Sequence, residues 1–442
     1  MEVLYERCAG LDVHKKIVVA ARTQPGAGKE RVRSVAQFGT TTPDLLQLVD
    51  WLHAGGVTHV AMESTGEFWK PLYNLLESEF TVLLVNPQHV KNVPGRKTDL
   101  KDAEWLNELL AHGLLRASFI PPVAQRDLRD LTRHRTTLVE ERVRVVNRVQ
   151  KLLEGANIKL ASVASDVLGV SGRAMLNALV AGQVDPAILA NLARGKLRDK
   201  LTELERALTG VVRPHHRFLL AQQLAHIDFL DEQIAAVSQA IDQHIAVMSS
   251  DTPKSSGDST TSDPAATGTR KGLAPMAPAV AIPILDMVPG IDLRVAEVWM
   301  AELGTDMSRF PTDDDGAAWA GLAPGNYESA GRRHSGRLRQ GNRALRNALI
   351  QAAWAAAHTK GTYLAAQYHR LAARRGRKRA LVAVAHSIFV IVYHMLRDHT
   401  PYVELGGNYF DERQKDKVIN RLRKRIEKLG YIAHIELAPA AT

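Results

Sequence analysis

The chain has 442 residues, of which 45% are hydrophobic and 24% charged, and its formal net charge is +10. A chain of this length is too long to fold around a single hydrophobic core, so two or three domains are expected. The composition is that of a globular protein. The basic excess suits a polyanionic partner, with nucleic acid as the first candidate and an anionic membrane surface as the second.

The single cysteine, the N-terminal segment and the longest apolar run lead to an expected cellular compartment. Cys8 is the only cysteine, which excludes an intramolecular disulfide and a zinc site built from several cysteines, so we expect a reducing compartment, the cytoplasm. The N-terminal MEVLYERCAG lacks the pattern of a signal peptide. The longest apolar run, residues 381–396, contains histidines and is short for a membrane span. We therefore expect a buried helix there and no membrane partner.

Residues 1–122 have the pattern of an α/β domain. The runs CAGLDVH, KIVVAAR and VRSVAQF predict an antiparallel meander. A helix should follow from residue 43, then a short strand ending in Glu63, a second helix, the strand TVLLV and a last helix. The order βββαβαβα is that of the ribonuclease H-like fold, with a partly parallel sheet.

Four acidic residues in this domain are candidate metal ligands. Asp12 and Glu63 lie in or beside apolar strands, and Asp99 and Asp102 in KTDLKDAEWL are three residues apart at the start of a predicted helix. Converging carboxylates repel one another unless cations offset the charge, and oxygen ligands suit two magnesium ions. Two simpler readings stay open: acids at a helix start also favour its dipole, and the four could be unrelated surface residues.

Residues 123–248 read as long helices. Apolar residues at three- to four-residue steps over 125–154 and 217–248 predict a coiled-coil arm or a dimerisation hairpin. The first of these helices carries a row of arginines that includes Arg129 and Arg133. Such a row either faces solvent or contacts phosphates. Residues 249–278 are rich in Ser, Thr, Pro, Gly and Ala and predict a disordered linker.

Residues 279–410 should form a helical C-terminal domain. IPILDMVPGIDLRVAEVWMAELG predicts two helices around a Gly turn, which either offers N–H groups to a phosphate or is an ordinary helical hairpin. Ser329 and Ser335 lie in a Gly-containing segment that we expect to be a flexible loop, where a serine among guanidinium groups could attack a phosphate. The candidate nucleic-acid contacts there are Arg332, Arg333, Arg337, Arg339 and Arg343. Residues 411–442 form a basic tail whose predicted helix either contacts nucleic acid or faces solvent.

The motifs together resemble the transposases of the insertion sequence 110 family. The matching segments are GLDVHKK, AMESTGEFWKPLYNLL, VNPQHVKNVPGRKTDLKDAEWLNELL, VPGIDLRVAEVWMAELG and WAGLAPGNYESAGRRHSGRLRQGNRALRNALIQAAW. The family pairs an N-terminal RuvC-like DEDD domain with a C-terminal domain that carries a serine. The segments run in order to about residue 400 and leave out the long linker and the basic tail.

The resemblance implies a recombinase that moves its element through a circular intermediate. Asp12, Glu63, Asp99 and Asp102 would bind two magnesium ions, and the N-x-x-SAG serine of the family falls on Ser329, which would form a covalent phosphoserine link with DNA. Family members act as dimers and tetramers with sites composed from two subunits, and several use a noncoding bridge RNA to select DNA. The alternatives are a RuvC-like endonuclease that uses a metal-activated water, and a non-catalytic nucleic-acid-binding scaffold.

Overall fold

The structure is a computed structural model that describes residues 2–26, 30–64, 66–87, 90, 102–250, 273–325, 327–329, 332–335, 338, 340–432 and 434, with the backbone alone in 327–329 and 332–335. The chain divides into two compact units, one ending at Pro121 and the other beginning at Pro122.

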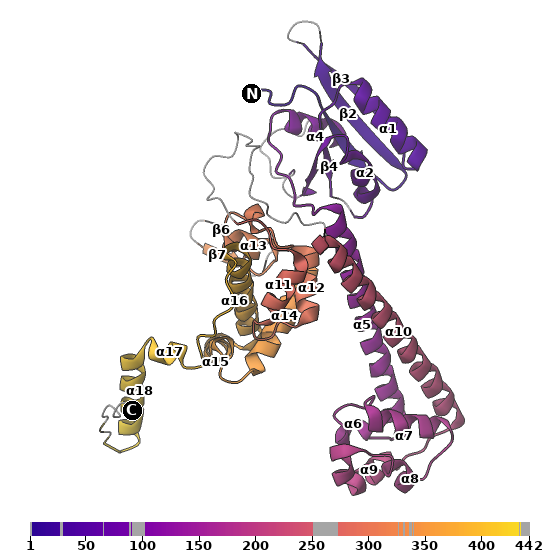
Figure 1. The fold of residues 1–442 in the computed structure, drawn as a ribbon, viewed down its shortest axis with the longest axis vertical. Coiled ribbons are helices and arrows are strands. Elements are labelled where there is room, and N and C mark those ends of the chain that lie inside the picture. Colours follow the sequence, from indigo (N-terminus) through magenta and orange to yellow (C-terminus); the bar gives the residue numbers. More distant parts are fainter. Residues whose placement is uncertain are drawn as a thin grey trace. The chain divides into compact units, whose positions relative to one another are not determined.

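The first unit is built on a five-stranded mixed sheet in the order β3-β2-β1-β4-β5 (Figure 1). Strands β1 (Cys8–Val13), β2 (Ile17–Pro25) and β3 (Arg31–Gly39) are antiparallel neighbours, as the meander pattern predicted. Strand β4 (His59–Glu63) pairs in parallel with β1, and β5 (Thr81–Val85) pairs in parallel with β4. The two parallel strands extend the meander beyond β1, which lies at the centre of the sheet.

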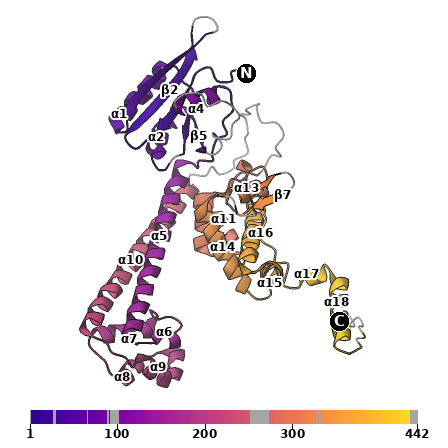
Figure 2. The ribbon, with the colours of Figure 1, turned by 180° about the vertical axis from the view of Figure 1, so that it is seen from behind.

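Helices cover both faces of this sheet (Figure 2). On one face Leu11 and Met62 pack in a core cluster with residues of α1 (Thr42–Ala54) and α2 (Trp69–Leu76). On the other face Cys8 and Ala61 pack against Leu110 of α4 (Asp102–Ala111). Alternate residues of β1 and β4 therefore face α4.

Helix α4 lies unusually close to β1 and runs antiparallel to it. Cys8, at the start of β1, donates a hydrogen bond from Sγ to Asn107 Oδ1 over 3.2 Å, whereas Gly10 lies against the first turn of the helix. A Cβ atom on Gly10 would stand 2.3 Å from the carbonyl oxygen of Ala103. The start of α4 is consequently held at the carboxyl end of β1.

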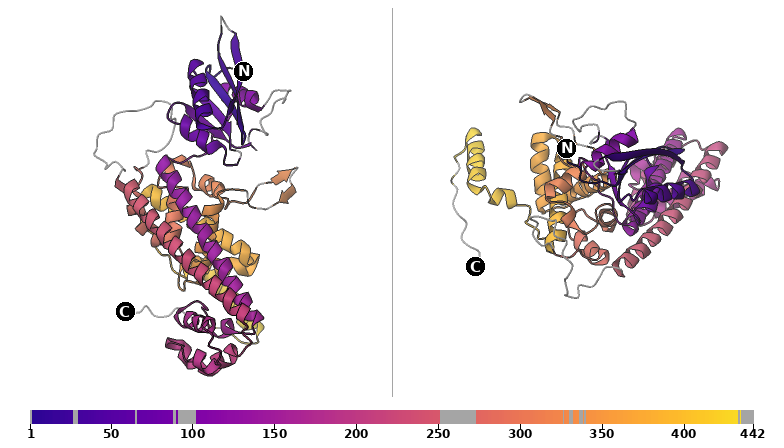
Figure 3. Two further views of the ribbon diagram at one scale, coloured as in Figure 1. Left: turned by 90° about the vertical axis from the view of Figure 1, so that its right-hand side faces the viewer. Right: turned by 90° about the horizontal axis from the view of Figure 1, so that it is seen from above.

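The second unit begins with two long helices, α5 (Val123–Gly155) and α10 (Pro214–Ser250), which lie side by side (Figure 3). The 3.6-residue pattern predicted both, and each extends slightly beyond the predicted range. Their apolar faces contribute Val145, Val149, Leu224 and Ile227 to one buried cluster. The segment that joins them contains α6 (Leu160–Val163), α7 (Val170–Val180), α8 (Pro186–Ala190), the short 3-10 helix η1 (Gly195–Lys200) and α9 (Leu201–Leu208).

Helices also dominate the rest of the unit. Residues 251–272, most of the predicted linker, lie outside the described residues, whereas α10 continues to Ser250 and a new helix begins at Pro278. The helical elements are α11 (Pro278–Asp286), α12 (Leu293–Glu302), η2 (Met307–Arg309), α13 (Asp313–Trp319), α14 (Arg343–His358), α15 (Tyr363–Arg375), α16 (Arg377–Asp398), α17 (Tyr409–Glu412) and α18 (Lys415–Lys428).

The turn between α11 and α12 has a packing role. Gly290 has a φ of +91°, and a Cβ on it would stand 2.1 Å from the carbonyl oxygen of Ala352 in α14. Only glycine combines this conformation with so close an approach. The glycine of the predicted helical hairpin thus lies against α14, and its contact favours the structural reading of that motif.

Helix α16 contains the apolar run that the sequence marks as a buried helix. In the described part of the chain it alone has the length and hydropathy of a membrane span, and half of that window is buried inside the protein. Phe389 and Tyr393 are buried, and the Tyr393 hydroxyl donates a hydrogen bond of 2.8 Å to the Phe310 carbonyl. These contacts are typical of a core helix.

Candidate active site

The carboxyl ends of two adjacent strands carry the first two predicted metal ligands. In the parallel pairing of β1 with β4, Leu11 lies opposite Met62, and Asp12 and Glu63 are the next residues on their strands. Because side chains alternate along a strand, Asp12 is on the same face as Gly10, and Glu63 on the same face as Ala61. Both carboxylates are therefore on the face that α4 covers.

Helix α4 contributes the third acid. Asp102 is its first residue, directly before Ala103, which lies against Gly10. A carboxylate at this position is stabilised by the positive end of the helix dipole, so the capping interpretation and the ligand interpretation both apply to it. Asp99 lies outside the described residues. The fold thus brings Asp12, Glu63 and Asp102 to one end of the sheet.

The surroundings of Asp12 are partly open to solvent. Its side chain is 27% exposed, and Oδ2 lies 3.1 Å from Nε2 of His14. Three carboxylates suit an ion that prefers oxygen ligands, such as Mg²⁺. Among the residues that the structure describes, however, no group of three or more His, Cys, Asp or Glu side chains is arranged closely enough to hold a metal ion.

The predicted nucleophile lies in the second unit, on a small hairpin. Strands β6 (Tyr327–Ser329) and β7 (Arg332–Ser335) are antiparallel, with Ser329 paired to Arg332 and Glu328 paired to Arg333. We expected a flexible loop here, because Gly and Ser dominate the segment. The structure instead gives strand pairing, which fixes the backbone of Ser329 directly across from that of an arginine.

The base of this hairpin is held by close backbone contacts. Pro324 and Leu338 form an isolated bridge, and the amide of Asn342 donates a hydrogen bond of 2.9 Å to the carbonyl of Trp319. A Cβ on Gly341 would stand 2.4 Å from the amide nitrogen of Gly321, so the two segments leave room only for glycine there. The chain thus enters and leaves the hairpin at neighbouring points.

Asn342 connects the hairpin base to a buried carboxylate. Its Oδ1 accepts a hydrogen bond from the amide of Leu345 and caps α14, and its Nδ2 donates to Oε2 of Glu302 over 2.6 Å. Glu302, at the end of α12, is 0% exposed. One side chain therefore serves both the start of α14 and the end of α12.

Two arginines of α5 neutralise Glu302. Nε of Arg129 lies 3.0 Å from Glu302 Oε2, and Nε of Arg133 lies 2.7 Å from Oε1. Arg133 also donates from Nη2 to Oε2 over 2.9 Å, and Arg129 from Nη2 to the Glu302 carbonyl over 2.7 Å. Burial lowers the pKa of Arg129, and the charge of Glu302 opposes that shift. These contacts join the long helix α5 to the end of α12.

These ion pairs give several arginines of the row on α5 a partner within the chain. Arg129 and Arg133 were candidates for contact with nucleic acid, but both guanidinium groups bind a carboxylate of the same chain. A third arginine of the row, Arg135, is buried and forms an ion pair with Glu297, which is 0% exposed. At these three positions the arginines have a structural role, and contact with nucleic acid stays a prediction for Arg129 and Arg133.

The other arginines predicted to contact nucleic acid are on the hairpin or follow it in the sequence. Arg343 is exposed at the first position of α14. Arg332 and Arg333 are on β7, where the structure describes the backbone alone, and Arg337 and Arg339 lie outside the described residues.

Three polar residues that contact these sites, His14, Glu302 and Asn342, were not predicted from the sequence. His14 follows Asp12 by two residues, and this strand spacing could have indicated their contact. Glu302 and Asn342 carry no comparable signal, since each is an ordinary polar residue beside a helix end until the fold brings them together.

Comparison with known proteins agrees with this arrangement. Residues 9–158 match a DEDD transposase model of the IS110 type, described as a transposase, and residues 283–369 match the model "Transposase IS116/IS110/IS902 family". A comparison with curated proteins gave no match. The first match contains the sheet with Asp12, Glu63 and Asp102, and the second contains the hairpin with Ser329. The two regions define a DNA transposase, whose mixed α/β N-terminal unit is consistent with a ribonuclease H-like fold.

The two matches together span more than half of the chain, and the protein belongs to the IS110 family of transposases. Membership implies DNA recombinase activity and a DNA substrate.

Proposed function

We propose that this transposase cleaves and rejoins DNA through a covalent phosphoserine intermediate formed by Ser329, with two magnesium ions held by Asp12, Glu63, Asp99 and Asp102. The observation that supports the proposal is that Asp12 and Glu63 stand at the carboxyl ends of the adjacent strands β1 and β4, on the face covered by α4, and that Asp102 is the first residue of α4. Acids at the ends of adjacent strands have little value for packing and suit phosphodiester chemistry.

The acidic residues would bind the metal ions with their negative charge and fix the positions of those ions. Asp12 and Glu63 extend from strands whose register fixes their spacing, and Asp102 extends from a helix packed closely on β1. Bound magnesium would supply positive charge beside the scissile phosphate. His14, within hydrogen-bonding distance of Asp12, would orient that carboxylate.

Ser329 would act as the nucleophile. Its Oγ would lose its proton and form a bond to phosphorus while the bond from phosphorus to the leaving DNA oxygen breaks, and that leaving oxygen would take up a proton. The number of phosphate ester bonds is unchanged, so the reverse reaction can rejoin DNA without an energy source. Pairing of Ser329 with Arg332 across the hairpin supports this role, because guanidinium groups stabilise the charge that develops on phosphate.

The family resemblance adds partners to the proposal. We propose that the protein works in the cytoplasm as a dimer or tetramer, and that a noncoding RNA of its element guides it to DNA. The net charge of +10 supports nucleic-acid partners.

The decisive experiment looks for a protein–DNA adduct. Wild type, Ser329→Ala and Ser335→Ala are incubated with junction DNA of the element, Mg²⁺ and the RNA that co-purifies with the protein, and each mixture is denatured. We expect an adduct that maps to Ser329 in wild type and in Ser335→Ala, and none in Ser329→Ala. Ser335 is a matched control because it lies on the same hairpin.

Each alternative gives a different result. Cleavage by Ser329→Ala together with the absence of any adduct in wild type would support a RuvC-like endonuclease that uses water. Full recombination in a chelator would contradict the metal-dependent proposal, and no loss of targeting after ribonuclease treatment would contradict RNA guidance.

A further inference from the structure

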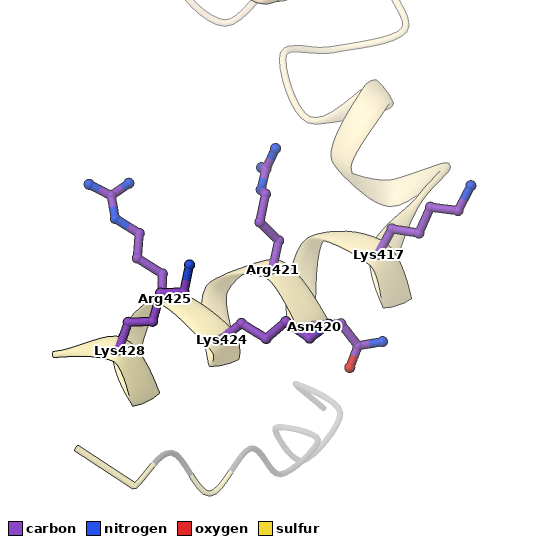
Figure 4. A pocket seen from close by; sticks show the side chains of 6 residues that line it. All are labelled: Lys417, Asn420, Arg421, Lys424, Arg425 and Lys428. Carbon is purple, nitrogen blue, oxygen red and sulfur yellow. The ribbon is translucent and has the colours of Figure 1, made fainter. Parts of the chain in front are cut away.

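The basic helix α18 lies beyond both regions that match the family and has three chemically distinct sides. Lys417, Arg421, Lys424, Arg425 and Lys428 follow one another at steps of four, three, one and three residues, which places them on one side of a helix. With Asn420 they line a shallow hollow, and Figure 4 shows their side chains spaced along the helix. We name this set, from Lys417 to Lys428, the basic stripe.

The acids of the helix are kept away from the basic stripe. At 100° per residue, Asp416 and Glu427 fall on another side, together with Arg423. Arg423 pairs with Glu427 over 3.7 Å. Over residues 415–428, which the structure describes in full, none of the five cations of the basic stripe forms an ion pair. Their positive charges are thus exposed and available to an external anion.

The length and diameter of the helix fit duplex DNA. Lys428 lies 11 positions after Lys417, which corresponds to about 16 Å along the helix. An α-helix enters the major groove of B-form DNA, about 12 Å wide, whereas the major groove of A-form RNA is deep and narrow. The apolar side of α18, formed by Val418, Ile419, Leu422 and Ile426, has no aromatic residue of the kind that anchors interfacial membrane helices.

We propose that the basic stripe of α18 is an additional DNA-binding surface, which contacts the phosphates of duplex DNA in or beside the major groove. A member of a DNA transposase family has duplex DNA as its substrate, so this polyanion is available to α18. The basic stripe would add phosphate contacts outside the two regions that match the family. The contacts carry no sequence information, so they increase affinity for any duplex and leave target choice to other parts of the complex.

Two double variants of the full-length protein test the proposal. R421Q/R425Q removes two charges from the basic stripe, and K415Q/R423Q removes two charges from the same helix outside it. Both lower the net charge equally, and glutamine has nearly the helix propensity of the residues it replaces. Circular dichroism establishes that both variants retain their helical content.

The measurement is the equilibrium affinity for a 30-base-pair duplex as a function of salt concentration. We expect R421Q/R425Q to reduce the magnitude of the slope of log K against log salt by about 1.8, the value for two lost phosphate contacts, and K415Q/R423Q to leave it unchanged. Binding requires no strand chemistry, so failure of the serine mechanism would not alter this result.

Other outcomes would overturn the proposal. Equal slopes for the two variants would show that only net charge matters. Loss of affinity for duplex RNA, but not for duplex DNA, would assign the stripe to RNA. Weaker binding of R421Q/R425Q to vesicles of phosphatidylcholine and phosphatidylserine, with unchanged DNA affinity, would assign it to a membrane surface.

Discussion

Two groups of carboxylates in this protein have opposite environments. Glu297 and Glu302 are fully buried, and arginines of α5 neutralise both. Asp12 and Glu63 lie at the carboxyl ends of the adjacent strands β1 and β4, and Asp102 is the first residue of α4. Asp12 is partly exposed, and its carboxylate lies 3.1 Å from the imidazole of His14.

The two groups differ in what their charges do: the buried carboxylates stabilise the fold, and the carboxylates near the sheet are the proposed metal ligands. A buried carboxylate without a partner costs several kcal/mol, so the fold must supply cations, and Glu302 has two of them. Carboxylates that lie together in a solvent-accessible place can instead acquire an external cation. Substitutions should therefore affect stability at the first group and activity at the second.

The largest effect is expected for Glu302→Ala. It leaves Arg129 and Arg133 without their counterion and Asn342 without its acceptor, so we expect the free energy of unfolding to fall by about 3–5 kcal/mol. Denaturant titration followed by circular dichroism measures this loss. Glu154→Ala is the control, because Glu154 forms an exposed pair with Lys159 in the same unit and should cost less than about 1 kcal/mol. Equal losses in the two variants would mean that burial of Glu302 has no energetic importance.

Asp12→Asn should show the reverse pattern. We expect recombination to fall by more than about 100-fold, because residues that merely orient metal ligands already contribute about 10–100-fold. The free energy of unfolding should stay within about 0.5 kcal/mol or rise, since one of several like charges is removed. Asp50→Asn, an exposed acid on α1 of the same unit, should leave both quantities unchanged. A large loss of stability in Asp12→Asn would place Asp12 in the structural group.

The smallest effect is expected for Cys8→Ala, which removes a buried thiol that stays neutral in the folded protein. Burial raises the pKa of its thiol from 9.0 to about 11. The folded thiol therefore keeps its proton where the unfolded thiol loses it, and this stability is present below about pH 9 and is lost as the pH rises. Between about pH 8 and 10 the free energy of unfolding should fall by about 1 kcal/mol more in wild type than in Cys8→Ala. Identical pH profiles would show that burial does not shift the thiol.

Much of the first unit could be predicted because its signals are local. Alternation along CAGLDVH and KIVVAAR indicated the meander, and acids on two strands expected to be neighbours indicated that Asp12 and Glu63 could lie close together. Helix α5 was predicted over 125–154 and spans Val123–Gly155, since an uninterrupted apolar pattern without Gly or Pro fixes a helix.

The second unit contained features that the sequence does not indicate. Strands β6 and β7 have three and four residues, and their sequences, YES and RRHS, lack the β-branched pattern of a strand. The contact between Arg129 and Glu302 joins residues 173 positions apart. Charge patterns reveal pairs within one helix, whereas pairs between distant helices depend on packing that is known only from the folded chain.

Gly10 has a consequence for how this protein tolerates mutation. The residue contacts no substrate in our proposal, yet any side chain there would push the first turn of α4 away from β1 and move Asp102 relative to Asp12. Substitutions at a position with no chemistry of its own can thus inactivate the enzyme by changing the separation of two acids. A copy of the element with a single changed codon at this position would encode a protein that keeps all four acids and the serine but in which Asp102 has moved relative to Asp12.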